Sequence, residues 1–284
     1  MRFVTFEIQG HAHAGAVTGD SVIDLSSAGF LTLQDLIRHG SVAHPAIDKL
    51  IENPPQAAKL PLDKVKLLAP IPRPNKLICV GLNYLDHAKE TGAEVPKVPT
   101  IFNKFATAVI GPGENVVLPK VSKAPDYEAE LAFVIGVGGR HIAAEDWSKH
   151  VFGYTIVNDV SARDYQRATT QWLMGKTFDT FAPIGPWIVT ADEIPDPHAL
   201  DIQLEINGEV LQDSNTRELI FKVPELIAFL SSVFTLEPGD IVSTGTPAGV
   251  GFTRKPPRFL RPGEEMVVRI EGIGELRNPI VAEA

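Results

Sequence analysis

The chain has 284 residues, of which 44% are hydrophobic, and it carries a formal net charge of −9 at pH 7. This length accommodates one large domain, or one large and one small domain, and the apolar share excludes an intrinsically disordered chain. The acidic balance argues against nucleic acid or an anionic membrane surface as the main partner. The single cysteine, Cys79, lies in an apolar run and reads as a small buried residue, so an internal disulfide is excluded.

The N-terminal segment Met1–Phe6 is short and flanked by polar residues, which is not the pattern of a secretory signal peptide. Apolar runs elsewhere stay well short of the roughly 20 residues that a membrane-spanning helix needs. We therefore expect a cytoplasmic protein without a membrane partner.

Residues 1–70 are predicted to form a small accessory domain of α/β structure. The pattern predicts three short strands followed by two helices, at residues 1–9, 11–16, 21–25, 31–39 and 46–51. Thr18-Gly19-Asp20 is a hairpin turn signal between the second and third strands. Dense prolines between Pro54 and Pro74 cannot continue a helix or an inner strand, so we place the domain boundary here.

Residues 71–284 are predicted to form a β-rich main domain. Short strands are expected at residues 77–80, 128–137, 152–157, 187–190, 201–206, 241–243 and 266–271. A short helix over 84–91 would end at Gly92, and a longer one over 223–234 has Pro224 in its first turn. Because the strands do not alternate with long helices, the pattern predicts an α+β fold and not a doubly wound sheet.

Two glutamates, Glu128 and Glu130, lie just before the apolar run Leu131-Ala132-Phe133-Val134-Ile135 and are separated by one residue. Residues i and i+2 of a strand point to the same face, so both carboxylates would project side by side from a core strand. Burying a carboxylate without a positive partner is costly. A divalent metal ion between the two is the leading hypothesis, and an exposed face of an edge strand is the alternative.

Asp159 follows the apolar strand that ends at Asn158 and would add a third carboxylate to the pair. Three carboxylates with open positions suit a hard cation, Mg²⁺, Mn²⁺ or Ca²⁺, better than Zn²⁺. Spacing alone leaves the alternative open that Asp159 is an ordinary turn residue.

His87 and Glu90 lie three residues apart on the predicted helix, and hence on one face. A carboxylate beside an imidazole fixes its tautomer and raises its basicity, so that the pair can take a proton from water near neutral pH. A surface ion pair on a short helix has the same spacing.

Basic residues and a glycine-rich segment complete the candidate site. Arg163, Lys176 and Lys104 could hold a substrate carboxylate or a developing enolate, although a lone lysine is more often simply solvated. The glycines of residues 243–251 allow backbone N–H groups to approach an anion closely. This segment lacks the Gly-Lys-Ser/Thr end of a P-loop, and no helix pattern follows it, which disfavours a nucleotide site.

Together these segments resemble the fumarylacetoacetate hydrolase (FAH) family over residues 70–280. The resemblance rests on five motifs in family order: Val80-Gly81-Leu82-Asn83-Tyr84 with His87 and Glu90, Asp126-Tyr127-Glu128-Ala129-Glu130-Leu131, Asn158-Asp159-Val160-Ser161-Ala162-Arg163-Asp164, Gly175-Lys176-Thr177-Phe178-Asp179-Thr180, and Thr244-Gly245-Thr246-Pro247-Ala248-Gly249-Val250-Gly251. The tail from Arg254 to Leu260, with Gly263, is most similar to the FAH-domain-containing protein 2 branch.

The resemblance implies a fold of mixed, highly curved β-sheets around a metal site, usually in a homodimer. It implies Mg²⁺ or Mn²⁺ at Glu128, Glu130 and Asp159. It also implies a His–Glu dyad at His87 and Glu90 on a mobile lid, and an active-site lysine at Lys176. The candidate substrate-binding residues are Arg163, Gln166, Lys104, Gly245 and Thr246.

The activity implied is divalent-metal-dependent hydrolysis of a C–C bond in a 2,4-diketo acid of the acylpyruvate type, with release of a pyruvate enolate. Glu90 would orient His87, which takes a proton from water, while Lys176 helps to hold the negative charge. The alternative keeps the enolate but uses no water: oxaloacetate decarboxylation, keto–enol tautomerisation, or another isomerase or lyase reaction. A non-catalytic binding module is a remote alternative, because His87, Glu90 and Lys176 are all present.

Overall fold

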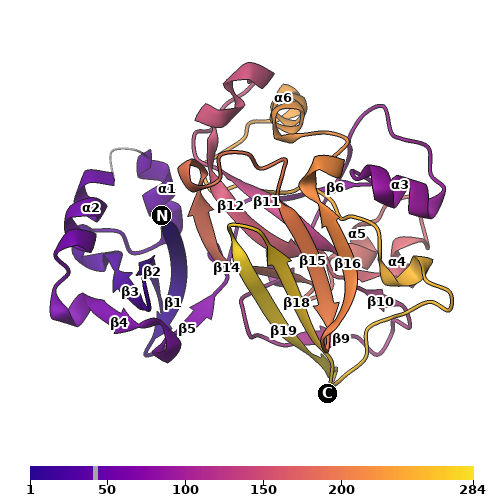
Figure 1. Ribbon diagram of the computed structural model, residues 1–284, viewed down its shortest axis with the longest axis horizontal. Coiled ribbons are helices and arrows are strands. Elements are labelled where there is room, and N and C mark those ends of the chain that lie inside the picture. The colour runs from indigo at the N-terminus through magenta and orange to yellow at the C-terminus, as the bar shows by residue number, and fades with distance from the viewer. Residues whose placement is uncertain (41–43) are drawn as a thin grey trace.

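Strands dominate the fold of the computed structural model, which describes residues 1–40 and 44–284 (Figure 1). The strands are β1 (Arg2–Ile8), β2 (His11–Thr18), β3 (Ser21–Asp24), β4 (Lys59–Pro61), β5 (Lys66–Leu68), β6 (Leu77–Gly81), β7 (Thr100–Asn103), β8 (Val109–Ile110), β9 (Val116–Leu118), β10 (Pro125–Asp126), β11 (Ala129–Ile135), β12 (Val151–Asn158), β13 (Ser161–Ala162), β14 (Ala182–Thr190), β15 (Asp201–Ile206), β16 (Glu209–Asn215), β17 (Ile241–Ser243), β18 (Glu265–Ile270) and β19 (Gly274–Ala282). The helices are α1 (Leu33–His39), α2 (His44–Glu52), α3 (Leu85–Thr91), α4 (Arg163–Gln166), α5 (Leu173–Lys176) and α6 (Val223–Val233).

A twelve-stranded mixed sheet runs through the described part of the chain. Its order is β4-β3-β2-β1-β14-β12-β11-β17-β6-β7, with β5 paired to β1 and β8 paired to β14. β11 lies inside this sheet, antiparallel to β12 on one side and to β17 on the other. All of its residues are buried, which explains its nearly continuous apolar sequence. The charged Glu130 is the exception in this strand.

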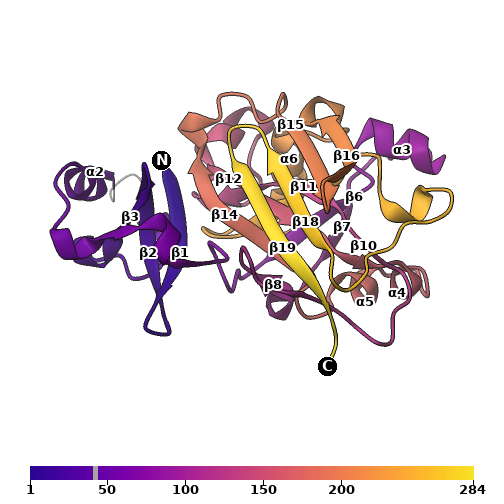
Figure 2. The ribbon, with the colours of Figure 1, turned by 60° about the horizontal axis from the view of Figure 1, so that its bottom comes forward.

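A second sheet packs against the first and closes the main core. Its order is β16-β15-β18-β19-β9, and Figure 2 shows β16, β15, β18 and β19 side by side, crossing in front of β11 and β12. Ile202, Leu204 and Ile206 of β15 are buried in alternation, as expected for a strand with one face on the core. They join Leu131 and Phe133 of β11 in one apolar cluster.

The N-terminal strands and α1 and α2 lie at one end of the molecule (Figure 1). β1 pairs antiparallel with β14, with Phe3 opposite Ile188. Phe3 and Leu36 also share a buried apolar cluster with Val134 of β11. The division into residues 1–70 and 71–284 as separate domains stays a prediction.

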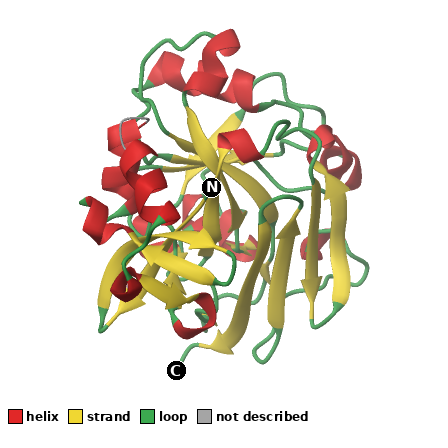
Figure 3. Ribbon diagram, turned by 60° about the vertical axis from the view of Figure 1, so that its left-hand side comes forward, coloured by secondary structure: helices red, strands yellow, loops and turns green. Residues whose placement is uncertain are grey.

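The α+β, β-rich class predicted from the sequence is confirmed, with strands through the centre and short helices around them (Figure 3). The predicted helix over 84–91 is α3, which ends at Gly92 in a left-handed conformation with φ 67°. The strand expected from Glu128 begins one residue later, because the Glu128 N–H donates to the Asn158 side chain at 3.1 Å. Within the described ranges, none of the helices combines the length and the apolar character needed to span a bilayer.

Candidate active site

Three carboxylates meet where β11 begins and β12 ends. The antiparallel register places Ala129 opposite Asn158, so the next residues outward, Glu128 and Asp159, are also neighbours. The Asp159 N–H donates to the Glu128 carbonyl at 2.9 Å. One side-chain oxygen each of Glu128, Glu130 and Asp159 lies within 4.8 Å of the other two, and all three residues are buried. Two adjacent strands thus bring together the three carboxylates singled out in the sequence.

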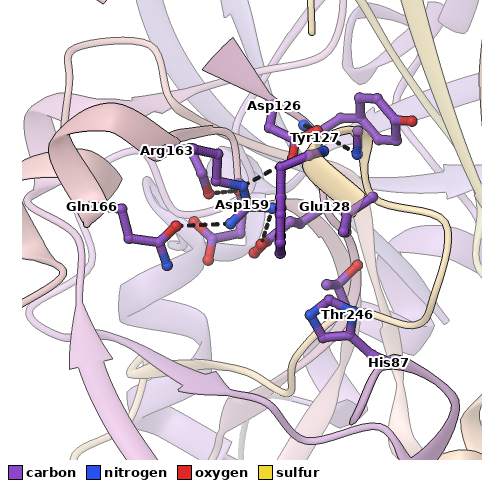
Figure 4. A network of polar contacts seen from close by, with 12 residues as sticks. His87, Asp126, Tyr127, Glu128, Asp159, Arg163, Gln166 and Thr246 are labelled. Atoms are coloured by element: carbon purple, nitrogen blue, oxygen red, sulfur yellow. Dashed lines mark hydrogen bonds and ion pairs between the residues drawn. The ribbon is translucent and has the colours of Figure 1, made fainter. Parts of the chain in front are cut away.

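Buried cations surround this carboxylate cluster. Lys176 Nζ lies 2.6 Å from Glu128 Oε2 and 2.7 Å from Asp159 Oδ2. Lys104 forms an ion pair with the other oxygen of Asp159. Arg163 lies 2.6 Å from Glu128 Oε1, and Figure 4 shows it between the strand-end carboxylates and Gln166.

The two glutamates differ in charge environment. Burial alone would raise the pKa of Glu128, but Arg163 and Lys176 outweigh it and hold that pKa well below its usual range. Burial, reinforced by Asp159 and Glu128, instead raises the pKa of Glu130 well above its usual value. Within the described residues Glu130 forms no ion pair, so it is the carboxylate of the cluster that lacks a positive partner.

The donor set fits a divalent cation. Four buried carboxylates, Asp126 and the three of the cluster, face three buried cations, Lys104, Arg163 and Lys176. When all four are ionised, the carboxylates exceed the cations by one charge, and Glu130 is the one left uncompensated; its raised pKa reflects this, and a bound cation would offset it. Because all three cluster donors are carboxylate oxygens, the site suits a hard cation.

The His87–Glu90 pair forms on α3 as its spacing predicts. His87 Nδ1 lies 3.1 Å from Glu90 Oε2, which favours the tautomer with the proton on Nδ1 and leaves the Nε2 lone pair free. The second oxygen of Glu90 accepts hydrogen bonds from the Gly249 N–H at 3.0 Å and from Thr253 Oγ1 at 2.8 Å. These bonds tie α3 to the glycine-rich loop that closes one side of the site.

Glu128, Glu130 and His87 line one cavity of about 200 Å³. This volume is below the roughly 300–1,000 Å³ of pockets for drug-sized ligands, so the cavity suits a small substrate. Of the predicted substrate-binding residues, Arg163, Gln166 and Thr246 line the cavity. Lys104 and Gly245 do not line it: they contact Asp159 and Glu130 from behind, the latter through the Gly245 N–H at 3.0 Å.

Sequence reasoning missed the apolar wall and one further cation. The wall residues are Val80, Leu82, Phe102, Trp172 and Phe252, and the cation is Arg167. One signal for a bulky neighbour was available, because a glycine, Gly81, ends the apolar strand β6 and a glycine in a strand often marks a close approach of another group. A Cβ at Gly81 would lie 2.1 Å from Trp172 Cζ3, so glycine permits this close approach.

Comparisons with known proteins agree with the motifs. A family model described as fumarylacetoacetate (FAA) hydrolase, C-terminal, matches residues 76–281. The oxaloacetate tautomerase FAHD2A, mitochondrial, of Bos taurus is 46% identical over 290 residues, which span 99% of this chain and 92% of that protein. The human protein of the same name is 52% identical over 228 residues, 80% of this chain and 73% of that one.

Solved structures are similar over the whole chain. Maleylpyruvate hydrolase from Sphingobium sp. SYK-6, in complex with manganese(II) ion and pyruvate, has a TM-score of 0.85 at 34% identity and covers 100% of both chains. The 5-carboxymethyl-2-hydroxymuconate delta-isomerase from Mycobacterium smegmatis has a TM-score of 0.80 at 36% identity, also with 100% coverage of both.

The names of the curated relatives place those proteins in mitochondria, and this contradicts the cytoplasmic location expected from the sequence. That prediction is wrong. Its basis was the lack of a secretory signal pattern and of long apolar runs, and these features do not separate the cytoplasm from the interior of mitochondria.

Proposed function

The chain belongs to the fumarylacetoacetate hydrolase family, and from that premise we propose that it catalyses the keto–enol tautomerisation of oxaloacetate. Tautomerisation, the alternative reaction expected from the sequence, thus takes precedence over acylpyruvate hydrolysis. The observation that carries the proposal is that His87 lines the same small cavity as Glu128 and Glu130, two members of the carboxylate cluster. The tautomerase relatives, 46% and 52% identical to this chain, support the choice of substrate.

We propose that Glu128, Glu130 and Asp159 hold Mg²⁺ or Mn²⁺, with Ca²⁺ as a further possibility for an all-oxygen donor set. When bound, the cation would polarise the keto group and stabilise the negative charge that develops on its oxygen. The manganese(II) in the Sphingobium maleylpyruvate hydrolase supports this choice of cation.

The protein side chains would move a single proton. Tautomerisation transfers one proton between C3 and the C2 oxygen and adds no atom. His87, whose Nδ1 faces Glu90, takes the proton from C3 with Nε2. Lys176 lies among the carboxylates and holds the negative charge at the C2 oxygen. His87 then returns the proton to that oxygen, which gives the enol.

The test separates proton transfer from bond cleavage. Oxaloacetate is incubated in D₂O with the Mg²⁺-loaded protein, deuterium uptake at C3 is followed by NMR, and pyruvate is measured in parallel. A tautomerase accelerates exchange at C3 without releasing pyruvate above the spontaneous rate. Stoichiometric pyruvate would overturn the proposal in favour of decarboxylation, and exchange at the spontaneous rate would overturn it altogether.

Acylpyruvate hydrolysis is the second candidate. The dyad that removes a proton from C3 can equally take one from water, and the Sphingobium maleylpyruvate hydrolase shares the whole fold at 34% identity. A small acylpyruvate with Mg²⁺ tests it, because hydrolysis releases pyruvate and a carboxylic acid in equal amounts.

We also propose that the chain acts as a homodimer, as its family resemblance implies. Light scattering on a size-exclusion column should give a mass twice that of one chain. A monomeric mass at micromolar concentration would contradict this.

A further inference from the structure

Arg167 is a cation of the cavity wall that the proposed mechanism does not use. It directly follows α4 and is exposed, and it lines the same cavity as Glu128 and Glu130. Within the described part of the chain, its side chain forms no ion pair or hydrogen bond; its guanidinium contacts the ring of Phe252, 4.2 Å from the ring centre. Arg167 therefore offers an unpaired positive charge to whatever occupies the cavity.

The other cations of the wall are already engaged. Arg163 donates from Nε to Asp126 at 2.9 Å and lies 2.6 Å from Glu128. Lys176 lies between Glu128 and Asp159. Among the described residues that line the cavity, Arg167 is thus the cation available to an anionic substrate group that lies away from the carboxylate cluster.

Phe252 holds the Arg167 side chain in position. The guanidinium carbons of Arg163 and Arg167 lie 4.6 Å and 4.2 Å from the centre of the Phe252 ring. The backbone N–H of Phe252 donates to Asp126 at 3.1 Å, which fixes the residue to the site. A guanidinium stacked on an aromatic face keeps its N–H edge available for a carboxylate.

We propose that Arg167 is a specificity-determining residue that binds the second carboxylate of a short dicarboxylic α-keto acid. The inference rests on the proposed function, which places the keto-acid end at the carboxylate cluster. The negative charges of that cluster disfavour the second carboxylate nearby, whereas Arg167 can bind it through two parallel hydrogen bonds. The cavity would then select a dicarboxylic over a monocarboxylic keto acid.

The test compares two ligands that differ only at the distal group. Oxaloacetate carries a carboxylate where 2-oxobutyrate carries a methyl group. Binding of each to the Mg²⁺-loaded, full-length protein is read from tryptophan fluorescence, since Trp172 lines the cavity. In Arg167→Met, which keeps the length but removes the charge, the dissociation constant for oxaloacetate should rise roughly tenfold or more, and that for 2-oxobutyrate should change less than about twofold.

Two further variants sharpen the result. Arg167→Lys keeps the charge but loses the planar fork, so it should show a smaller loss than Arg167→Met. Arg38→Met removes the same charge from α1, at the far end of the molecule, and should leave both affinities unchanged (Figure 1).

Three outcomes would overturn the inference: unchanged oxaloacetate binding in Arg167→Met, equal weakening of both acids, or a wild-type protein without preference for oxaloacetate. Because the readout needs no turnover, it is independent of the proposed reaction. A selective loss of oxaloacetate binding supports the role of Arg167 even if C3 exchange shows that the protein is not a tautomerase.

Discussion

At the scale of single residues, Glu130 is distinguished because it forms no ion pair with any cation in the part of the chain that the structure describes. It is 1% exposed, and its Oε2 accepts hydrogen bonds from Ser243 and from the Gly245 N–H. A buried carboxylate held only by neutral donors destabilises the protein until a cation binds. Glu130 therefore favours cation binding but lowers the stability of the metal-free protein.

Glu130→Gln should separate the two effects. The amide keeps acceptors for Ser243 and Gly245 but removes the charge, so the metal-free variant should unfold at the same or a higher denaturant concentration than the wild type. In the wild type, Mg²⁺ at 100 times its dissociation constant should add about 2.7 kcal/mol to the free energy of unfolding, and the variant should lose this gain. Urea unfolding with Mg²⁺ and with EDTA measures both. Full Mg²⁺ stabilisation of the variant would refute the ligand role, and Glu145→Gln, at an exposed position, is the matched control.

Asn83 fixes two loops beside the cavity. It is fully buried; its amide donates to the carbonyls of Phe221 at 3.0 Å and Thr244 at 2.8 Å, and its side-chain oxygen accepts from the Phe221 N–H at 2.8 Å.

Asn83→Ala would remove the side-chain partner of these buried and partly buried backbone groups, at a cost of about 1–3 kcal/mol for each that stays unsatisfied. The free energy of unfolding in urea should fall by roughly 3 kcal/mol. The value of kcat/KM should also fall, because Asn83 holds Thr244 and the N–H of the next residue, Gly245, donates to Glu130. A variant with unchanged stability would show that water replaces the amide.

The sequence allowed the charged part of the site to be predicted, but not its walls. Glu128, Glu130 and Asp159 were recognisable because carboxylates next to core strands violate the usual pattern. Trp172 lies in a loop and Phe252 in a single 3-10 turn, and an aromatic residue in such a segment is not unusual by itself. Their role depends on long-range contacts, such as that of Gly81 with Trp172, which spacing along the chain does not encode.

At the scale of elements, α3 is held at the site by a carboxylate whose pKa is lowered. Burial alone would raise the pKa of Glu90, but hydrogen bonds from His87 and Thr253 lower it below the usual 4.5. A group whose pKa is lowered in the closed state stabilises that state above its ordinary pKa, and the contribution is lost as the pH falls.

The closure of α3 should therefore weaken as the pH falls from about 4.5 through the lowered pKa of Glu90, because the carboxylate then becomes protonated. Hydrogen exchange of the α3 amides, relative to those of α6, measures this opening. Glu90→Gln should open α3 at neutral pH as well and remove most of the pH dependence. Equal protection of α3 at pH 4 and pH 7 in the wild type would contradict the argument.

Elements with a sequence period were predictable, and very short ones were not. α3 and α6 were expected from helical spacing together with Gly92 and Pro224 as end signals. α4 and α5 have four residues each, which is about one turn and too short to show a period. These two helices carry Arg163, Gln166 and Lys176. Arg163 and Lys176 form ion pairs with Glu128 at the strand end, and such long-range contacts fix the positions of the two helices.

At the scale of the whole molecule, the N-terminal residues complete the core of the main sheet. Phe3 and Leu36 share a buried cluster with Val134, Val157 and Ile188. Burial of one such side chain contributes roughly 1.5–3 kcal/mol, so exposing three of them would offset much of a net stability of about 5–15 kcal/mol.

A chain of residues 71–284 alone should therefore be poorly soluble or unfold at a clearly lower temperature than the full chain. Light scattering and thermal unfolding of both chains measure this. If the shortened chain is monodisperse with an unchanged melting temperature, residues 1–70 are a dispensable appendage and the shared core contributes little.

The carboxylate cluster lies at the adjoining ends of β11 and β12, inside the main sheet, whereas most of the cavity wall comes from α3, α4, α5 and the segment around Phe252, with Val80 of β6 and Phe102 of β7. This arrangement separates what must stay fixed from what can change. Neighbouring strands fix the positions of the carboxylates, whereas wall residues can be substituted without moving these metal-binding groups. New substrate ranges are thus accessible by loop grafting alone, and laboratory evolution of this scaffold should accumulate its substitutions in the walls and spare β11 and β12.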